Sequence, residues 1–161
     1  MQQLSNLITK GLEILVVLIL SGMSLLVIVN VALRFIADSG IVVSEELSRF
    51  MFIWVVFIGA ILAMKEESHI YVDFMRKALP KPVQSFVKLF CYCAMLYCCY
   101  LLFVGSYELY EFNMEDLSPV AQIPMGYIYI SGSVGAAGMG IILLFKIAST
   151  FKNIASKNWE K

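Results

Sequence analysis

One stretch of the chain, Ser44–Met64, has the length and composition of a helix that crosses a lipid bilayer. Residues 50–64 include no charged side chain, and the charged cluster at 65–67 closes the run. At about 1.5 Å per residue, a helix over 44–64 is about as long as the hydrocarbon core of a bilayer is thick. The stretch therefore predicts a transmembrane helix.

The composition predicts the same class for the whole chain. Of its 161 residues, 60% are hydrophobic and 15% are charged, whereas a soluble domain is about 45–50% apolar and about 25% charged. The apolar residues occur in long blocks that predict four transmembrane spans, at about 12–34, 44–64, 83–107 and 125–145. We expect an all-α integral membrane protein with one membrane domain, 1–161.

The segment between the second and third spans has a different pattern. Apolar residues recur at spacings of three to four over 66–79, with basic residues between them, and Pro80 and Pro82 follow. This pattern is typical of a short amphipathic helix lying in the membrane surface. His69, the one histidine of the chain, lies here, and we interpret it as a helix-end residue rather than a catalytic one.

The distribution of basic residues predicts the orientation in the membrane. With four spans, ten of the twelve Lys and Arg residues lie on the side of the two termini, and only Arg34 and Arg49 lie on the other. Cytoplasmic loops carry the excess of Lys and Arg. We therefore expect both termini in the cytoplasm of a bacterial cell, with the chain in its inner membrane.

The start of the second span carries several polar residues. Ser44 is a candidate helix cap, and Glu45 and Glu46 lie in the first turn, where the helix dipole favours negative charge. Glu45 and Arg49 are four residues apart, a spacing at which they can pair on one helix face. Arg49 is either an interfacial residue that reaches the headgroups or a polar contact for a neighbouring helix.

Two further patterns suggest contacts between helices. Asn30, four residues before Arg34 at the end of the first span, can hydrogen-bond across to another helix or be satisfied near the interface. In the fourth span, Gly132, Ala136 and Gly140 recur every four residues. This spacing predicts a groove where another helix backbone approaches closely, whether from this chain or from a partner.

Motifs for catalysis or cofactor binding are missing from the sequence. It has no glycine-rich phosphate loop, no Ser/His/Asp set and no cluster of metal ligands. The four cysteines lie within one apolar block, at 91–99, and are interpreted as packing residues. We expect no enzyme activity, no metal site and no cofactor in this chain, and no binding of nucleic acid.

The chain resembles a known family through motifs that recur in order along it. They are Asn30-x3-Arg34-Phe35, SEELSRF-x3-W-x4-GA-x2-A from Ser44, Ser118-Pro119, and Ile123-Pro124-Met125-Gly126. In this order, with four spans, they resemble the small membrane subunit of tripartite ATP-independent periplasmic (TRAP) transporters, the DctQ-type family. Two positions depart from the pattern, because Lys65 stands where an Arg is common and Ser133 where a proline is frequent.

The resemblance implies a scaffold role in a sodium-driven transporter. The expected partners are a large multi-helix subunit, which binds sodium and the substrate, a periplasmic substrate-binding protein, and membrane lipids. The substrate would be an organic acid, either sialic acid or a C4-dicarboxylate. The alternatives are a self-assembling small transporter or channel, and the membrane anchor of a redox enzyme. The candidate partner-interface and motif residues are Asn30, Arg34, Glu45, Glu46, Arg49, Trp54, Gly59, His69, Gly126, Gly132, Ala136 and Gly140.

Overall fold

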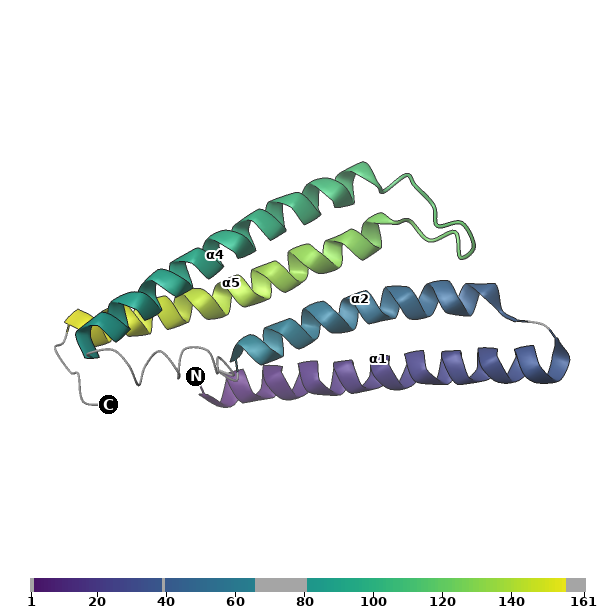
Figure 1. Ribbon diagram of the computed structural model, residues 1–161, viewed down its shortest axis with the longest axis horizontal. Coiled ribbons are helices and arrows are strands. Elements are labelled where there is room, and N and C mark those ends of the chain that lie inside the picture. The colour runs from purple at the N-terminus through teal and green to yellow at the C-terminus, as the bar shows by residue number, and fades with distance from the viewer. Residues whose placement is uncertain (1, 39, 66–80, 156–161) are drawn as a thin grey trace.

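A computed structural model of the protein describes residues 2–38, 40–65 and 81–155, which form four long α-helices (Figure 1). These are α1 (Gln2–Ala37), α2 (Val42–Lys65), α4 (Lys81–Phe112) and α5 (Gly126–Ala155). Each is long and apolar enough to cross a membrane. The predicted all-helical fold with four membrane-length helices is confirmed. The surface helix predicted at 66–79 lies outside the described residues.

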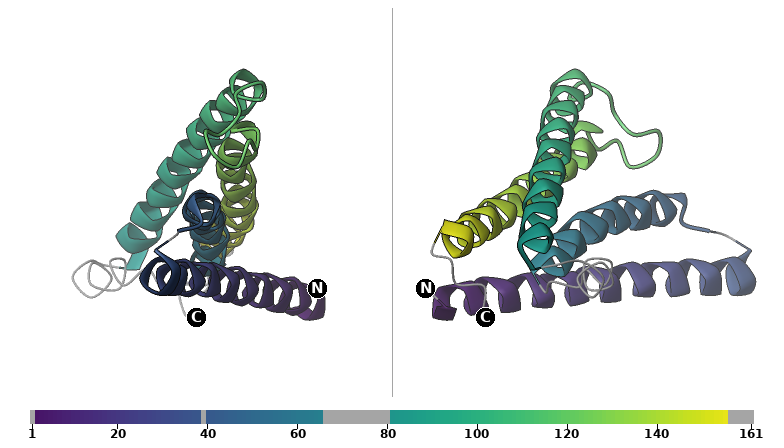
Figure 2. Two further views of the ribbon diagram at one scale, coloured as in Figure 1. Left: turned by 90° about the vertical axis from the view of Figure 1, so that its right-hand side faces the viewer. Right: turned by 60° about the vertical axis from the view of Figure 1, so that its left-hand side comes forward.

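The helices form two antiparallel hairpins, α1–α2 and α4–α5, that meet through α2 and α5 (Figures 1 and 2). The spatial order is α1, α2, α5, α4, and within the described ranges α1 makes no contact with α4 or α5. The helices therefore make an open arrangement and not a closed four-helix bundle. Because α2 has a neighbour on either side, it joins the two hairpins.

The two connections that the structure describes turn in different ways. The α1–α2 turn takes only residues 38–41, and Asp38 adopts a positive φ of 47° to reverse the chain. The α4–α5 loop spans residues 113–125 and folds back on itself through an isolated bridge between Leu117 and Pro124. Both connections lie at the same end of the molecule (Figure 1).

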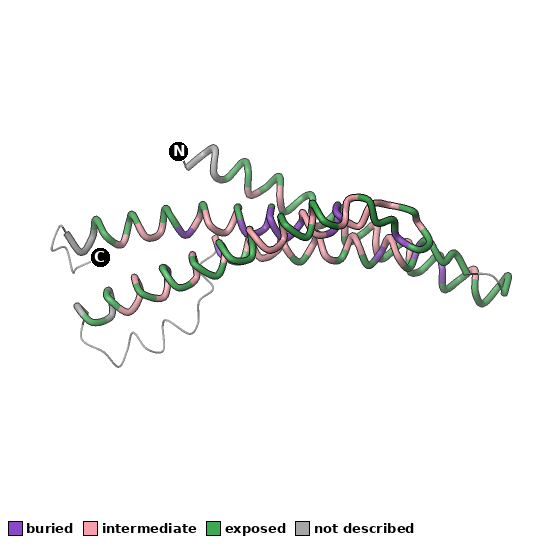
Figure 3. The backbone as a smooth tube through the Cα atoms, turned by 90° about the horizontal axis from the view of Figure 1, so that it is seen from above, coloured by how far each residue is buried: buried purple, intermediate pink, exposed green. Residues whose placement is uncertain are grey.

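Buried residues are few and lie where the helices converge (Figure 3). Met64, Tyr92 and Leu143 form the core cluster, which joins the end of α2 to α4 and α5. Elsewhere large apolar side chains point outward, as at Phe35, which is 87% exposed. An apolar surface of this extent is stable only where lipid or another protein covers it.

Candidate partner-binding surfaces

Asn30 of α1 caps the start of α2. Its Oδ1 accepts a hydrogen bond from the backbone N–H of Ile41 at 2.7 Å, and its Nδ2 donates to Glu45 Oε1 at 3.3 Å. The side chain is buried, with 8% of its surface exposed. Of the two interpretations of Asn30, the contact across to another helix is therefore the one found, and the other helix belongs to the same hairpin.

Two local predictions at this helix start differ from the structure. Helix α2 begins at Val42 rather than at Ser44, and the Ser44 hydroxyl donates to the Ile41 carbonyl at 2.7 Å instead of capping N–H groups. Asn30 takes the capping role because the four-residue turn brings it against Ile41. Glu45 is bonded to Asn30, and no ion pair joins it to Arg49, both of which the structure describes.

Glu46 binds the loop between α4 and α5. Its Oε2 accepts hydrogen bonds from the Ser118 hydroxyl at 3.2 Å, from the Val120 N–H at 3.3 Å and from the Ala121 N–H at 2.6 Å. Three donors converge on a single carboxylate oxygen, and bonds to a charged acceptor are the stronger kind. We call this contact the Glu46 clamp; it ties the N-terminal part of α2 to the loop that precedes α5.

The loop itself is shaped to present these donors. Ser118 N–H donates to the Ile123 carbonyl at 2.9 Å, and Ile123 N–H donates back to the Ser118 hydroxyl oxygen at 3.2 Å. Gln122 closes the turn with a positive φ of 52°. Gly126 then allows a close approach, since a Cβ there would lie 2.8 Å from Met114 Sδ and 3.0 Å from the Tyr110 carbonyl oxygen.

Two lysines tie the helices together at the opposite end of the molecule. Lys146 of α5 donates from Nζ to the Met64 carbonyl oxygen at 2.7 Å, in the last turn of α2. Lys65 donates from Nζ to the Thr9 hydroxyl of α1. Neither contact was predicted from the sequence, in which both lysines counted toward the orientation and Lys65 was also a departure from the family pattern. The last carbonyl groups of a helix have no partner within it, and Lys146 of the neighbouring helix satisfies one of them.

The small residues of α5 pack inside the chain, in part as predicted. A Cβ at Gly132 would overlap Ser106 of α4, and Ala136 is only 2% exposed. At Gly140, however, a Cβ would meet only Leu96 Cδ1 at 3.9 Å, which is an ordinary contact. The groove of close approach therefore does not extend to Gly140.

The closest approach of α5 to α2 is at glycines that the four-residue spacing did not include. A Cβ at Gly135 would lie 2.7 Å from Phe57 Cδ1 and 2.9 Å from Phe57 Cβ, and one at Gly138 would lie 2.5 Å from Ile61 Cδ1. A three-residue spacing in the sequence, at Gly132, Gly135 and Gly138, was the pattern that could have predicted this contact with α2. Gly59 of α2 has no atom within 4 Å of such a Cβ, so it marks no close contact here.

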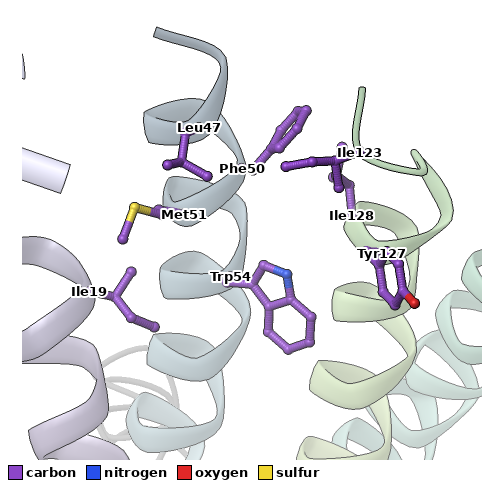
Figure 4. A pocket seen from close by; sticks show the side chains of 8 residues that line it. All are labelled: Ile19, Leu47, Phe50, Met51, Trp54, Ile123, Tyr127 and Ile128. Atoms are coloured by element: carbon purple, nitrogen blue, oxygen red, sulfur yellow. The ribbon is translucent and has the colours of Figure 1, made fainter. Parts of the chain in front are cut away.

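An apolar groove of about 250 Å³ lies over α2 between α1 and α5 (Figure 4). Helix α2 forms its floor, and Trp54 points into the space between α2 and α5 (Figure 4). We call it the α2 groove. Its lining residues are Ile19, Leu47, Phe50, Met51, Trp54, Ile123, Tyr127 and Ile128.

The remaining predicted residues lie apart from these contacts. Arg34 is exposed in the last turn of α1, and Arg49 is exposed on α2. His69 lies outside the described residues. Across the three described ranges, no group of three or more His, Cys, Asp or Glu side chains could hold a metal ion. The four cysteines are free thiols.

Comparison with known proteins gives a consistent result. Residues 23–153 match the family described as "Tripartite ATP-independent periplasmic transporters, DctQ component". A protein of Haemophilus influenzae named as a TRAP transporter small permease is 38% identical over 150 residues, which are 93% of either chain. The C4-dicarboxylate TRAP transporter small permease protein DctQ of Vibrio cholerae is 30% identical over 60% of this chain and 41% of its own.

A third relative is larger than this chain. The sialic acid TRAP transporter permease protein SiaT of Haemophilus influenzae is 25% identical over 47% of this chain, and the match covers 12% of that protein. The family match covers most of the chain, and the first relative matches it nearly end to end. The chain therefore belongs to the DctQ family of TRAP transporter small permease subunits, a transport component of the bacterial inner membrane and not an enzyme.

Proposed function

We propose that this chain is a static brace for the large permease subunit of a TRAP transporter. The observation that carries the proposal is the open order α1, α2, α5, α4, in which the described helices leave most of their apolar surface uncovered by one another. In an apolar 18-residue stretch of each span, between 6% and 39% of the residues are buried. A chain this exposed has surface to offer a second membrane protein on several faces.

Internal ties make the chain suitable for a static role. Helix α2 is bonded to α1 through Asn30 and Lys65, and to the α5 side through the Glu46 clamp and Lys146. These polar contacts lie at both ends of α2, with the glycine contacts to Phe57 and Ile61 between them. A helix held at both ends and packed closely between them resists sliding, as a brace must while its partner moves.

The transport role follows from the family together with the residues present. The substrate we propose is an organic acid, a sialic acid or a C4-dicarboxylate, because the names of two relatives specify these anions. Sodium and substrate would bind the large subunit. The described helices of this chain place no cluster of acidic or metal-binding side chains at membrane depth, and α5 runs unbroken through Ser133.

We also propose that the end of the molecule with the α4–α5 loop faces the periplasm and helps to dock the substrate-binding protein. The Lys and Arg distribution supports this orientation, since ten of twelve lie on the opposite side. The loop region carries Glu108, Glu111, Glu115 and Asp116 and no basic residue between 108 and 125. The Glu46 clamp gives this loop one defined shape, which lowers the entropic cost of docking.

Reconstitution of the transporter in liposomes tests the proposed role of this chain as a brace. In liposomes with a sodium gradient, the binding protein and labelled substrate, this chain alone should give background uptake. The large subunit with this chain should give uptake, and the large subunit without it should not. Uptake by this chain without any partner would refute the proposal and favour a self-assembling transporter.

A further inference from the structure

We propose that the α2 groove receives a transmembrane segment of the large permease subunit, and that the Trp54 indole donates a hydrogen bond to an oxygen atom of that segment. The inference rests on the proposed partnership with the large subunit and adds the face and the atom through which it acts. The position of Trp54 along α2 is unusual for a tryptophan in a membrane helix.

Trp54 lies near the midpoint of α2, a helix long enough to cross the membrane. Helix α2 runs from Val42 to Lys65, so Trp54 is about 18 Å from one end and about 17 Å from the other. Tryptophans in membrane proteins are enriched at the two interfaces, where the indole N–H reaches polar headgroups. A mid-span tryptophan has no such access, and its position calls for a neighbour within the bilayer.

The indole N–H has no acceptor among the residues that the structure describes. The side chain is half-buried and points into the α2 groove (Figure 4), and no hydrogen bond to it is found from any described residue. The surrounding side chains are apolar except for the hydroxyl of Tyr127, which makes no hydrogen bond to the indole. An unpaired donor in hydrocarbon costs free energy, because no water is present to satisfy it.

Lipid cannot supply the missing acceptor at this depth. The hydrocarbon core is about 30 Å thick, so the ester and phosphate oxygens of phospholipids lie about 15 Å from the midplane. Acyl chains that fill the groove would satisfy its apolar walls but not the N–H group. A protein segment can do both, because Ser, Thr, Asn or Gln side chains form hydrogen bonds between membrane helices.

The side of α2 that faces away from the groove is exposed. Phe52, two residues from Trp54, is rotated by about 200° around the helix and is 52% exposed. Val56 and Arg49 are exposed on the same side as Phe52, and an arginine there can extend toward headgroups. That side suits lipid, whereas the floor and walls of the groove suit an inserted segment with one polar group.

Cross-linking in the assembled complex tests the assignment. The photoreactive residue p-benzoylphenylalanine would be placed at position 54, and at position 52 as the matched control, with the large subunit coexpressed. We expect the large subunit to be linked from position 54 and lipid from position 52. Lipid alone at position 54, or the large subunit linked only from position 52, would overturn the groove assignment.

Substitution tests the hydrogen bond separately. Trp54→Phe keeps an aromatic ring and removes the donor, and we expect the affinity for the large subunit to fall about three- to tenfold. Phe52→Leu should leave it unchanged. Equal affinity of Trp54→Phe and the unmodified chain would refute the hydrogen bond. If the unmodified chain forms no complex with the large subunit, the proposed function itself fails.

Discussion

The Glu46 carboxylate accepts a hydrogen bond from the hydroxyl of Ser118, 72 positions further along the chain, at 3.2 Å. This relationship joins the two helical hairpins at one end, as the bond from Lys146 to the Met64 carbonyl joins them at the other. The two hairpins are thus held through α2 and α5 at both ends of their contact. Each of these ties can be tested by substitution.

Glu46→Ala should destabilise the folded chain by about 1–3 kcal/mol, because it leaves the donors of the loop without their acceptor. The Ala121 N–H, now 2.6 Å from the carboxylate, would lose most. Thermal unfolding in detergent measures the effect. Glu115→Ala is the control, since Glu115 is an exposed carboxylate on the same loop; an equal effect of the two substitutions would contradict the Glu46 clamp.

Asn30→Ala should cost about 0.5–2 kcal/mol, the range for loss of a helix cap. The substitution removes the acceptor of the Ile41 N–H and the donor to Glu45. The loss should appear as a lower unfolding midpoint and as faster hydrogen exchange at the start of α2. Ser24→Ala, at an exposed site on the same helix, should change neither, and unchanged exchange in Asn30→Ala would refute the cap.

Gly135→Ala should destabilise the α2–α5 contact by about 1–3 kcal/mol through overpacking. The new Cβ would lie 2.9 Å from Phe57 Cβ, an atom that can move only with the backbone. Gly59→Ala is the matched control: it meets no atom within 4 Å and should be neutral or slightly stabilising, because Ala favours the helix. The measurement is the difference between the unfolding midpoints of the two variants. A midpoint of Gly135→Ala equal to that of the unmodified chain would contradict the close contact between Gly135 and Phe57.

Labelling of introduced cysteines should place Lys77 and Lys157 in the cytoplasm, and Asp38 and Glu115 in the periplasm. The expectation follows from the ten-to-two distribution of Lys and Arg. The four native cysteines would first be replaced by serine, and an impermeant maleimide would be applied to intact cells. Protection of a cysteine at 115 in intact cells, with labelling only after lysis, would reverse the orientation.

The sequence by itself determined the class of the protein, its four membrane-length helices and its family. A charge-free block such as 50–64 can be read from the local sequence alone. Its length predicts a spanning helix because the thickness of the hydrocarbon core fixes how many apolar residues a span needs. The motif within Ser44–Met64 indicated the family without any information on how the helices pack. Asn30, too, was identified as a residue for contact between helices, although its partners Ile41 and Glu45 were not.

Only the tertiary structure decided which residues meet. Glu45 and Glu46 are adjacent in sequence and both suit a first helical turn, yet one binds Asn30 of α1 and the other binds a loop 72 to 75 residues away. Likewise, Gly135 and not Gly140 meets a neighbouring helix closely, because crossing geometry selects which turns touch. Such choices depend on helix rotation and crossing, and the local pattern of a single helix leaves both open.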